Sequence, residues 1–145
     1  MYEIAREINI SAPKEKVWQV LADVDNWQNW SPIINGSQGS AASGAKLQIT
    51  MAGKEGKDGP KYSPVVSEFD APNRFRWRAT MMAGFIFTND KLFELTDSGS
   101  GTKLVHKELF SGLMLKLFAS KLDKGVGPLL DSMNQALKER VESLA

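Results

Sequence analysis

The sequence contains no cysteine, a single histidine (His106) and no long hydrophobic run. The lack of cysteine excludes disulfides, thiolate metal ligands and a cysteine nucleophile. One imidazole leaves only carboxylates to complete a metal shell, so we expect no metal and no cofactor. No stretch of about 18 apolar residues is present, and the start lacks the basic-then-apolar order of a secretory signal. These absences predict a cytoplasmic protein without membrane insertion.

An excess of charge of one sign is also lacking, since 18 Lys and Arg residues balance 17 Asp and Glu residues. The net charge of +1 supplies no broad field toward nucleic acid or an anionic membrane, so we expect neither partner. Arg74, Arg76 and Arg78 form a basic stripe without interleaved aromatic residues, which we interpret as a solvated outer face of a sheet. The 145 residues suffice for one hydrophobic core, and we expect a single domain over residues 1–145, as a monomer or homodimer.

The order of the predicted elements is that of an α+β protein. Isoleucines alternate with polar residues over residues 4–10, which predicts an opening strand. Pro13 suits the first turn of a short helix, and a second short helical turn then holds Trp27 and Trp30 on one face. Residues 35–44 are small and polar, which indicates a loop or a weak edge strand. The later pattern predicts strands over residues 46–51, 62–69 and 74–79, and a flexible loop over residues 53–60.

A hairpin gives the most detailed prediction. Residues 97–101, with the sequence Asp-Ser-Gly-Ser-Gly, form a clear turn between strands over residues 85–96 and 102–110. If Asp97 faces Thr102, the register of the two strands is fixed, and the face without lysines points to the interior. The facing pairs on that inner face are Leu95 with Leu104, Phe93 with His106, and Lys91 with Glu108, and the same face carries Phe110.

The end of the chain has the pattern of one long helix. After Gly112, apolar residues recur at every third or fourth position as far as Leu144. This stripe predicts an amphipathic helix that lies on the sheet. Pro128 should kink the helix or divide it in two, and a bend at this point would admit a ligand.

The segments described above, in their order and spacing, resemble the SRPBCC superfamily over nearly the whole chain. The matching stretches are residues 8–13 with Val17 and Trp18, then residues 23–32, 93–95, 101–112 and 136–138. The resemblance implies the helix-grip fold of START and Bet v 1-like proteins: a seven-stranded antiparallel sheet wrapped around a long carboxyl-terminal helix, with two short helices after the first strand. It also implies a cavity for lipids, sterols, polyketides or other apolar molecules. It implies no single activity, because the superfamily includes carriers, receptors, polyketide cyclases and co-chaperones.

Lys91, His106 and Glu108 form the sharpest candidate site. The predicted register places the ammonium group beside the carboxylate and the imidazole one pair away. Such a trio can bind a ligand carboxylate or ketone through Lys91 while His106 and Glu108 exchange protons. The alternative is an internal ion pair, with His106 packed as a core side chain. Many members of the superfamily carry histidine where this chain has Lys91, so a proton-transfer role for that histidine is not carried over.

Aromatic and thioether side chains form a second candidate, an adaptable pocket for a flat or flexible apolar ligand. For any one of them, packing in the core is the more ordinary explanation, so the pocket is inferred from their number and from the resemblance. The predicted ligand-binding residues of this kind are Trp27, Trp30, Trp77, Met81, Met82, Phe85, Phe87, Phe93, Phe110 and Met133.

Three functions are compatible with these features. The first is binding or carriage of a small apolar ligand in a cavity that opens between residues 53–60, residues 81–84 and the last helix, with the polar trio as its anchor. The second is a cyclase or dehydratase, in which His106 or Glu108 is the general base and Lys91 stabilises an enolate. The third is a co-chaperone-like interaction module that contacts its partner through the protein surface.

Overall fold

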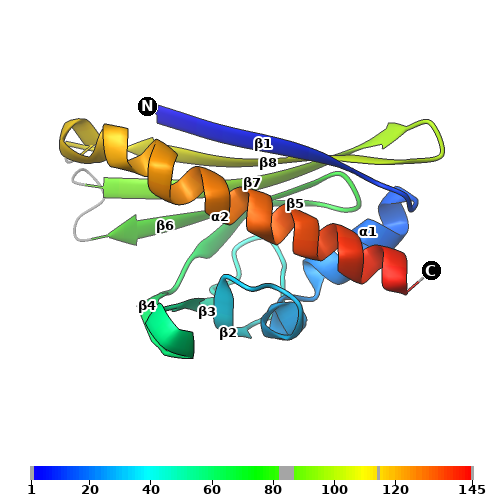
Figure 1. The fold of residues 1–145 in the computed structure, drawn as a ribbon, viewed down its shortest axis with the longest axis horizontal. Coiled ribbons are helices and arrows are strands. Elements are labelled where there is room, and N and C mark those ends of the chain that lie inside the picture. The colour runs from blue at the N-terminus through cyan, green and yellow to red at the C-terminus, as the bar shows by residue number, and fades with distance from the viewer. Residues whose placement is uncertain (1, 82–86, 114, 145) are drawn as a thin grey trace.

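The computed structural model describes residues 2–81, 87–113 and 115–144. The chain forms two antiparallel sheets and a long helix, α2 (Leu115–Ser143), which crosses one face of the larger sheet (Figure 1). In strand order, the larger sheet contains β1 (Tyr2–Ile10), β8 (Gly101–Ser111), β7 (Phe87–Ser98), β6 (Arg74–Met81) and β5 (Val65–Asp70). The smaller sheet contains β2 (Ile34–Gln38), β3 (Gln48–Ala52) and β4 (Asp58–Tyr62).

The α+β class and the antiparallel arrangement are confirmed, but the expected single seven-stranded sheet is wrong. The described residues contain eight strands in two sheets. β2 begins at Ile34 and continues into the polar stretch at residues 35–44, and β4 begins inside the predicted loop at residues 53–60. Both strands pair with β3 through their main chains, and neither shows the apolar alternation that would indicate a strand in the sequence. Pro64 lies between β4 and β5, where the sequence pattern predicts one continuous strand over residues 62–69.

The two short helices after the first strand are confirmed. They are α1 (Lys14–Ala22) and the 3-10 helix η1 (Val24–Asn29). Helix α1 buries Trp18 and Leu21 against the sheet, because these positions fall on one helical face. The indole Nε1–H of Trp27 donates a 2.8 Å hydrogen bond to the carbonyl oxygen of Leu21, and this bond fixes η1 against the end of α1.

Helix α2 is continuous through Pro128, so the prediction that this proline divides the helix in two is wrong. The apolar stripe explains the continuity. Leu130, Met133 and Leu137 are almost completely buried beyond the proline, and Val126 packs against the core before it. Both parts of the helix are therefore held on the same surface. Within the described ranges, no helix combines the length and apolarity needed to span a bilayer.

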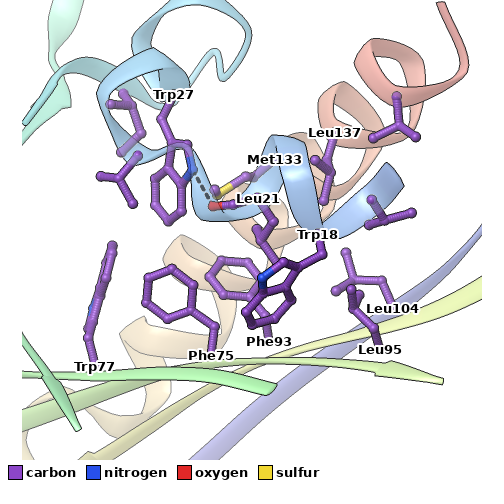
Figure 2. Close-up of a cluster of buried hydrophobic side chains, with 14 of the residues drawn as sticks. Trp18, Leu21, Trp27, Phe75, Trp77, Phe93, Leu95, Leu104, Met133 and Leu137 are labelled. Atoms are coloured by element: carbon purple, nitrogen blue, oxygen red, sulfur yellow. Dashed lines mark hydrogen bonds between the residues drawn. The ribbon is translucent and has the colours of Figure 1, made fainter. Parts of the chain in front are cut away.

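The main hydrophobic core lies where α1, η1 and the second half of α2 meet the large sheet (Figure 2). Its centre is a group of aromatic rings in mutual contact. The ring of Trp27 lies 5.4 Å from Trp77, 5.8 Å from Phe93 and 6.3 Å from Phe75, measured between centroids. All four rings are at most 1% exposed. This part of the interior is closely packed.

A smaller apolar cluster lies toward the opposite ends of β1 and β8. Ile4, Phe110 and Leu130 are its buried members, and Phe87 and Val126 pack against them while remaining only partly buried. The two clusters share the inner face of the large sheet with a group of polar side chains. Those polar side chains form the candidate site.

Candidate functional site

Lys91, Glu108 and His106 lie on the inner face of the large sheet, as the hairpin register predicts. Lys91 faces Glu108 across β7 and β8, Phe93 faces His106, and Leu95 faces Leu104, so this prediction is confirmed pair by pair. On the other side of β7, Trp77 of β6 faces Lys91. The row of Trp77, Lys91 and Glu108 therefore crosses three adjacent strands beneath helix α2.

Lys91 is a buried lysine whose ion pair with Glu108 is long. Its side chain is 6% exposed, and its Nζ lies 3.9 Å from Oε1 of Glu108, beyond ordinary hydrogen-bond distance. The same nitrogen lies 5.6 Å from the centroid of the Phe93 ring. Burial lowers the pKa of Lys91, and the negative charge of Glu108 opposes this shift only in part. The buried environment thus weakens the preference of Lys91 for its charged form.

His106 is completely buried and is oriented by two neighbours. Its ring stacks on Phe93 with 4.4 Å between centroids, and its Nδ1 lies 2.8 Å from Oδ1 of Asn134 on α2. Because an amide oxygen only accepts, Nδ1 carries the proton and Nε2 carries a free lone pair. Burial and the charge of Lys91 lower the pKa of His106 well below its usual range, against the opposing effect of the Asn134 hydrogen bond. The imidazole is therefore neutral.

Four buried polar atoms around this row make no hydrogen bond within the described part of the chain. They are Nε1 of Trp77, Nδ2 of Asn89, Nε2 of His106 and Nδ2 of Asn134. Asn89 precedes Lys91 by two residues on β7 and shares its inner face. Leaving a buried donor or acceptor without a partner costs about 1–3 kcal/mol. Several such atoms in one region indicate a place built to meet the polar part of another molecule.

Tyr62 is a member of this region that the sequence analysis missed. Its ring lies 6.3 Å from that of Trp77, and its hydroxyl contacts the sulfur of Met51 at 3.6 Å. Burial, together with the negative charge of Glu108, raises the pKa of Tyr62, so the phenol stays protonated. Asn89 and Asn134 were also missed. The sequence did carry a signal for both, since Asn89 has the parity of Lys91 in its strand and Asn134 follows the apolar stripe of α2.

The predicted aromatic residues divide into two groups. Trp27, Trp77 and Phe93 pack within the main core, together with Met133, whereas Phe110 and Phe87 belong to the smaller cluster and contact each other at 5.9 Å. Trp30 lies at the edge of the main core, with its ring 6.2 Å from that of Trp27, and its partly exposed side lines a surface groove of about 210 Å³ with Arg140. Phe85, Met82 and the side chain of Met81 lie outside the described residues, so their assignment to the pocket stays a prediction.

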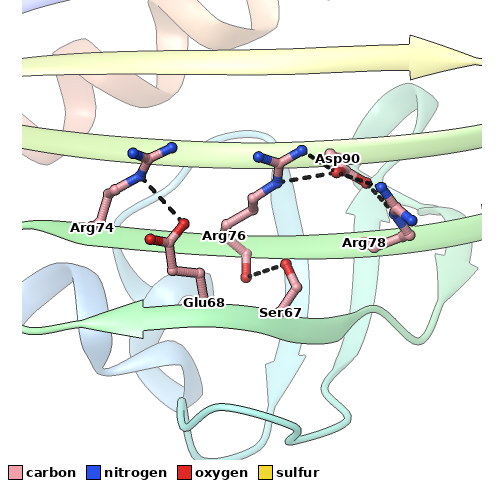
Figure 3. Close-up of polar contacts among 6 residues, drawn as sticks. All are labelled: Ser67, Glu68, Arg74, Arg76, Arg78 and Asp90. Atoms are coloured by element: carbon pink, nitrogen blue, oxygen red, sulfur yellow. Dashed lines mark hydrogen bonds and ion pairs between the residues drawn. The ribbon is translucent and has the colours of Figure 1, made fainter.

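The outer face of the large sheet carries an ion cluster that the sequence analysis did not anticipate (Figure 3). The side chain of Asp90 is only 5% exposed although it points away from α2. Arg76 donates to it from Nη2 at 2.6 Å and from Nε at 3.1 Å, and Arg78 donates from Nε at 2.7 Å. Burial raises the pKa of Asp90, but the bonds from both arginines outweigh it and the net shift is downward. The predicted basic stripe is therefore a largely neutralised cluster, beside a groove of about 390 Å³.

Metal binding finds no support in the donor set. Across residues 2–81, 87–113 and 115–144, no group of three or more histidine, cysteine, aspartate or glutamate side chains has the arrangement of a metal site.

Comparison with known proteins identifies a matching family model and solved structures of similar fold. A family model described as "Polyketide cyclase / dehydrase and lipid transport" matches residues 1–142. A search of curated proteins gives no match. The protein TTHA0849 from Thermus thermophilus is 19% identical, with a TM-score of 0.79 and 99% of each chain covered. Ara h 8.0201 is 15% identical, with a TM-score of 0.77 and 98% of each chain covered.

The structure of the di-domain ARO/CYC StfQ from the steffimycin biosynthetic pathway is similar to this chain as well. It is 8% identical with a TM-score of 0.78, and the match covers 97% of this chain and 51% of StfQ. At these identities the likeness is one of fold. Together with the family model, it confirms the resemblance to the SRPBCC superfamily.

Proposed function

The chain belongs to the polyketide cyclase/dehydrase and lipid transport family, and from this premise we propose that it binds a small, largely apolar molecule with one polar group. The ligand lies between the large sheet and α2. The observation that carries the proposal is the group of unpartnered polar atoms around Lys91 and His106, enclosed between two apolar clusters. An apolar wall with a few convergent polar groups is the usual composition of a ligand pocket.

The polar atoms indicate the chemistry of the ligand's polar group. Trp77, Asn89 and Asn134 each offer an unpartnered N–H donor, and Lys91 adds an amine. Donors in excess of acceptors favour a ligand oxygen that accepts hydrogen bonds, as in a ketone, an aldehyde or a carboxylate. The ligand oxygen would satisfy groups that are otherwise costly to bury.

The apolar part of the ligand is assigned to the smaller cluster. The aromatic core around Trp27 is closely packed, whereas Phe87 and Val126 in the smaller cluster are only partly buried. A ligand there would bury further apolar area at about 25 cal/mol per Å². The predicted opening between residues 53–60, residues 81–84 and α2 remains part of this proposal, and its residues 82–84 lie outside the described residues.

Native mass spectrometry of the purified protein tests the proposal first. A mass above that of the denatured chain would show a retained ligand and, once identified, its class. Titration calorimetry with dodecanoate, 2-dodecanone and dodecane then separates the polar anchor from the apolar contribution. We expect Lys91→Met to weaken dodecanoate binding about tenfold or more, since charge-assisted hydrogen bonds contribute roughly 1.5–3 kcal/mol, and to leave dodecane binding unchanged.

Lys103 provides a matched control, because it lies on the outer face of β8 and is 43% exposed. Lys103→Met should bind all three probes like the unmodified protein. A bare native mass, with no binding of any probe, would contradict the proposal and favour the interaction-module hypothesis.

One observation favours a second candidate, an enzyme that abstracts a proton. The neutral imidazole of His106 is fixed by Asn134 with a free lone pair on Nε2, which is the state required of a general base. Such an enzyme would take a proton from the carbon next to a ligand carbonyl. Loss of deuterium from an α-deuterated ketone, followed by NMR and abolished by His106→Gln, is the expected result. Equal rates for both proteins would refute this candidate.

A further inference from the structure

We propose that Lys91 is a site of covalent attachment, at which its amine condenses with the carbonyl group of an aldehyde or ketone ligand to form an imine. This inference rests on the proposed function, because the ligand must first enter the interior. It goes further by giving the buried lysine a chemical reaction and the ligand a defined reactive group.

The contacts of Lys91 leave its amine uncommitted. Its Nζ makes no hydrogen bond within the described residues, and the Glu108 oxygen at 3.9 Å is its nearest ionic partner. A lysine buried for structural reasons alone would be expected in a close, hydrogen-bonded pair, since an unpaired buried charge is costly. The arginines on the outer face show such pairing, with Arg76 at 2.6 Å from Asp90. Lys91 differs from these arginines because its nearest carboxylate oxygen lies 3.9 Å away.

The surroundings of Lys91 favour the reactive form of its amine. Only the neutral amine has the lone pair that attacks a carbonyl carbon, and apolar burial shifts the protonation equilibrium toward it. A lysine in water, by contrast, stays protonated near neutral pH. Lys91 is therefore the lysine expected to react at pH 7 once a ligand carbonyl lies beside it.

Neighbouring groups can move the protons that the reaction requires. The amine lone pair forms the C–N bond while the carbonyl π electrons move to oxygen, and one proton passes from nitrogen to that oxygen. Loss of the hydroxyl with a second proton then releases one water molecule and leaves the C=N bond. Glu108 is placed to accept a proton from the nitrogen and return it to the leaving hydroxyl. No oxidant, reductant or further reactant takes part.

The imine would also be stabilised once its nitrogen takes up a proton from water. The carboxylate of Glu108 compensates its positive charge, and the ring of Phe93 lies 5.6 Å from the nitrogen, within the range of a cation–π interaction. The unpartnered donors on the neighbouring inner positions can hold the carbonyl oxygen before water is lost. The same site thus assists the attack on the carbonyl group and stabilises the imine product.

Reductive trapping tests this inference on the intact protein. The protein is incubated with octanal and sodium cyanoborohydride at pH 7, and the modified lysines are identified by peptide mapping. We expect Lys91 to be labelled faster than any other lysine of the folded protein, since a lowered pKa raises the fraction of neutral amine at pH 7. Unfolding in urea should abolish this preference. Labelling of Lys91 at or below the rate of the exposed lysines would overturn the inference.

Two further measurements separate this inference from the proposed function. Octanol has the same chain without a carbonyl, so octanol binding without labelling of Lys91 overturns the covalent step and leaves the binding proposal standing. Absence of both octanol binding and labelling overturns both. Lys91→Arg removes the nucleophilic amine, so this variant should lose the rapid label. If that variant does not fold, Lys91→Met, which also lacks the amine, takes its place: it should lose the rapid label, and an unchanged rate of labelling would overturn the inference.

Discussion

Replacement of His106 should reduce the loss of folding stability that accompanies a fall in pH. In the folded chain the imidazole is buried and neutral, with its pKa well below the usual range because of burial and the charge of Lys91. In the unfolded chain it has an ordinary pKa near 6.5. Below that pH the unfolded state binds the additional proton and the folded state does not. Stability must therefore fall as the pH is lowered, by up to about 1.4 kcal/mol per pH unit.

The size of the effect can be worked out for a chosen interval. Between pH 7 and pH 5, a histidine that stays neutral in the folded state costs the native protein about 2 kcal/mol. The chain has only one histidine, so His106→Gln removes the whole imidazole contribution. The free energy of unfolding from urea titrations, measured at pH 5, 6 and 7 for both proteins, gives the result as a difference of slopes. Contributions of carboxylates largely cancel in that difference.

The prediction concerns the slope of the unfolding free energy against pH, and not the stability at any one pH. His106→Gln is expected to be less stable at pH 7, because it loses the stacking on Phe93. NMR of the single imidazole gives an independent check, since its signals should not titrate between pH 7 and pH 5. Parallel slopes for the two proteins, or an imidazole that titrates near pH 6.5 in the folded state, would refute the reasoning.

Three further predictions concern stability, each measured by urea denaturation. Asp90→Asn should cost about 2 kcal/mol, because two arginines lose a charged acceptor, and a loss below about 0.5 kcal/mol would mean that solvent screens this cluster. Trp27→Ala should cost about 3–5 kcal/mol by opening a cavity among packed rings, and a smaller loss would mean that the core collapses around it. Gly125→Ala should stabilise helix α2 by about 0.5–1 kcal/mol, since none of the described residues comes within 4 Å of the added methyl group. Gly127→Ala should gain less, because its methyl group would meet the Arg6 guanidinium, and equal gains would contradict this contact.

The inner face of the large sheet could be predicted because two independent patterns agree there. The turn at residues 97–101 fixes the register of β7 and β8, and the lysines of β8 mark the face that meets water. Together these patterns predict that Lys91 lies beside Glu108, and the structure confirms this pairing. Strand parity has a period of two, so one correct turn determines every inward residue of the hairpin.

The other residues of the two polar groups could not be predicted from the sequence, because their roles depend on contacts with residues distant in the chain. Asp90 was not singled out, since only the pairing of β6 with β7 shows that two arginines surround it. Tyr62 gains its place from the small sheet, whose strands β2 and β4 lack apolar alternation. The apolar stripe of α2 marks the position of Asn134, but its partner His106 is known only when α2 is laid on β8. These are properties of packing, and local patterns do not encode them.

The pairing of β1 with β8 also determines the order in which this protein can assemble. Ile10 pairs with Thr102 and Tyr2 with Phe110, so roughly a hundred residues must be synthesised before the first strand meets its neighbour, and such distant pairing makes folding slow. Until then both edges of β1 are open, and another nascent chain could occupy the edge that β8 later covers. The isoleucines that later close the interior are the same residues that a chaperone would have to shield during synthesis.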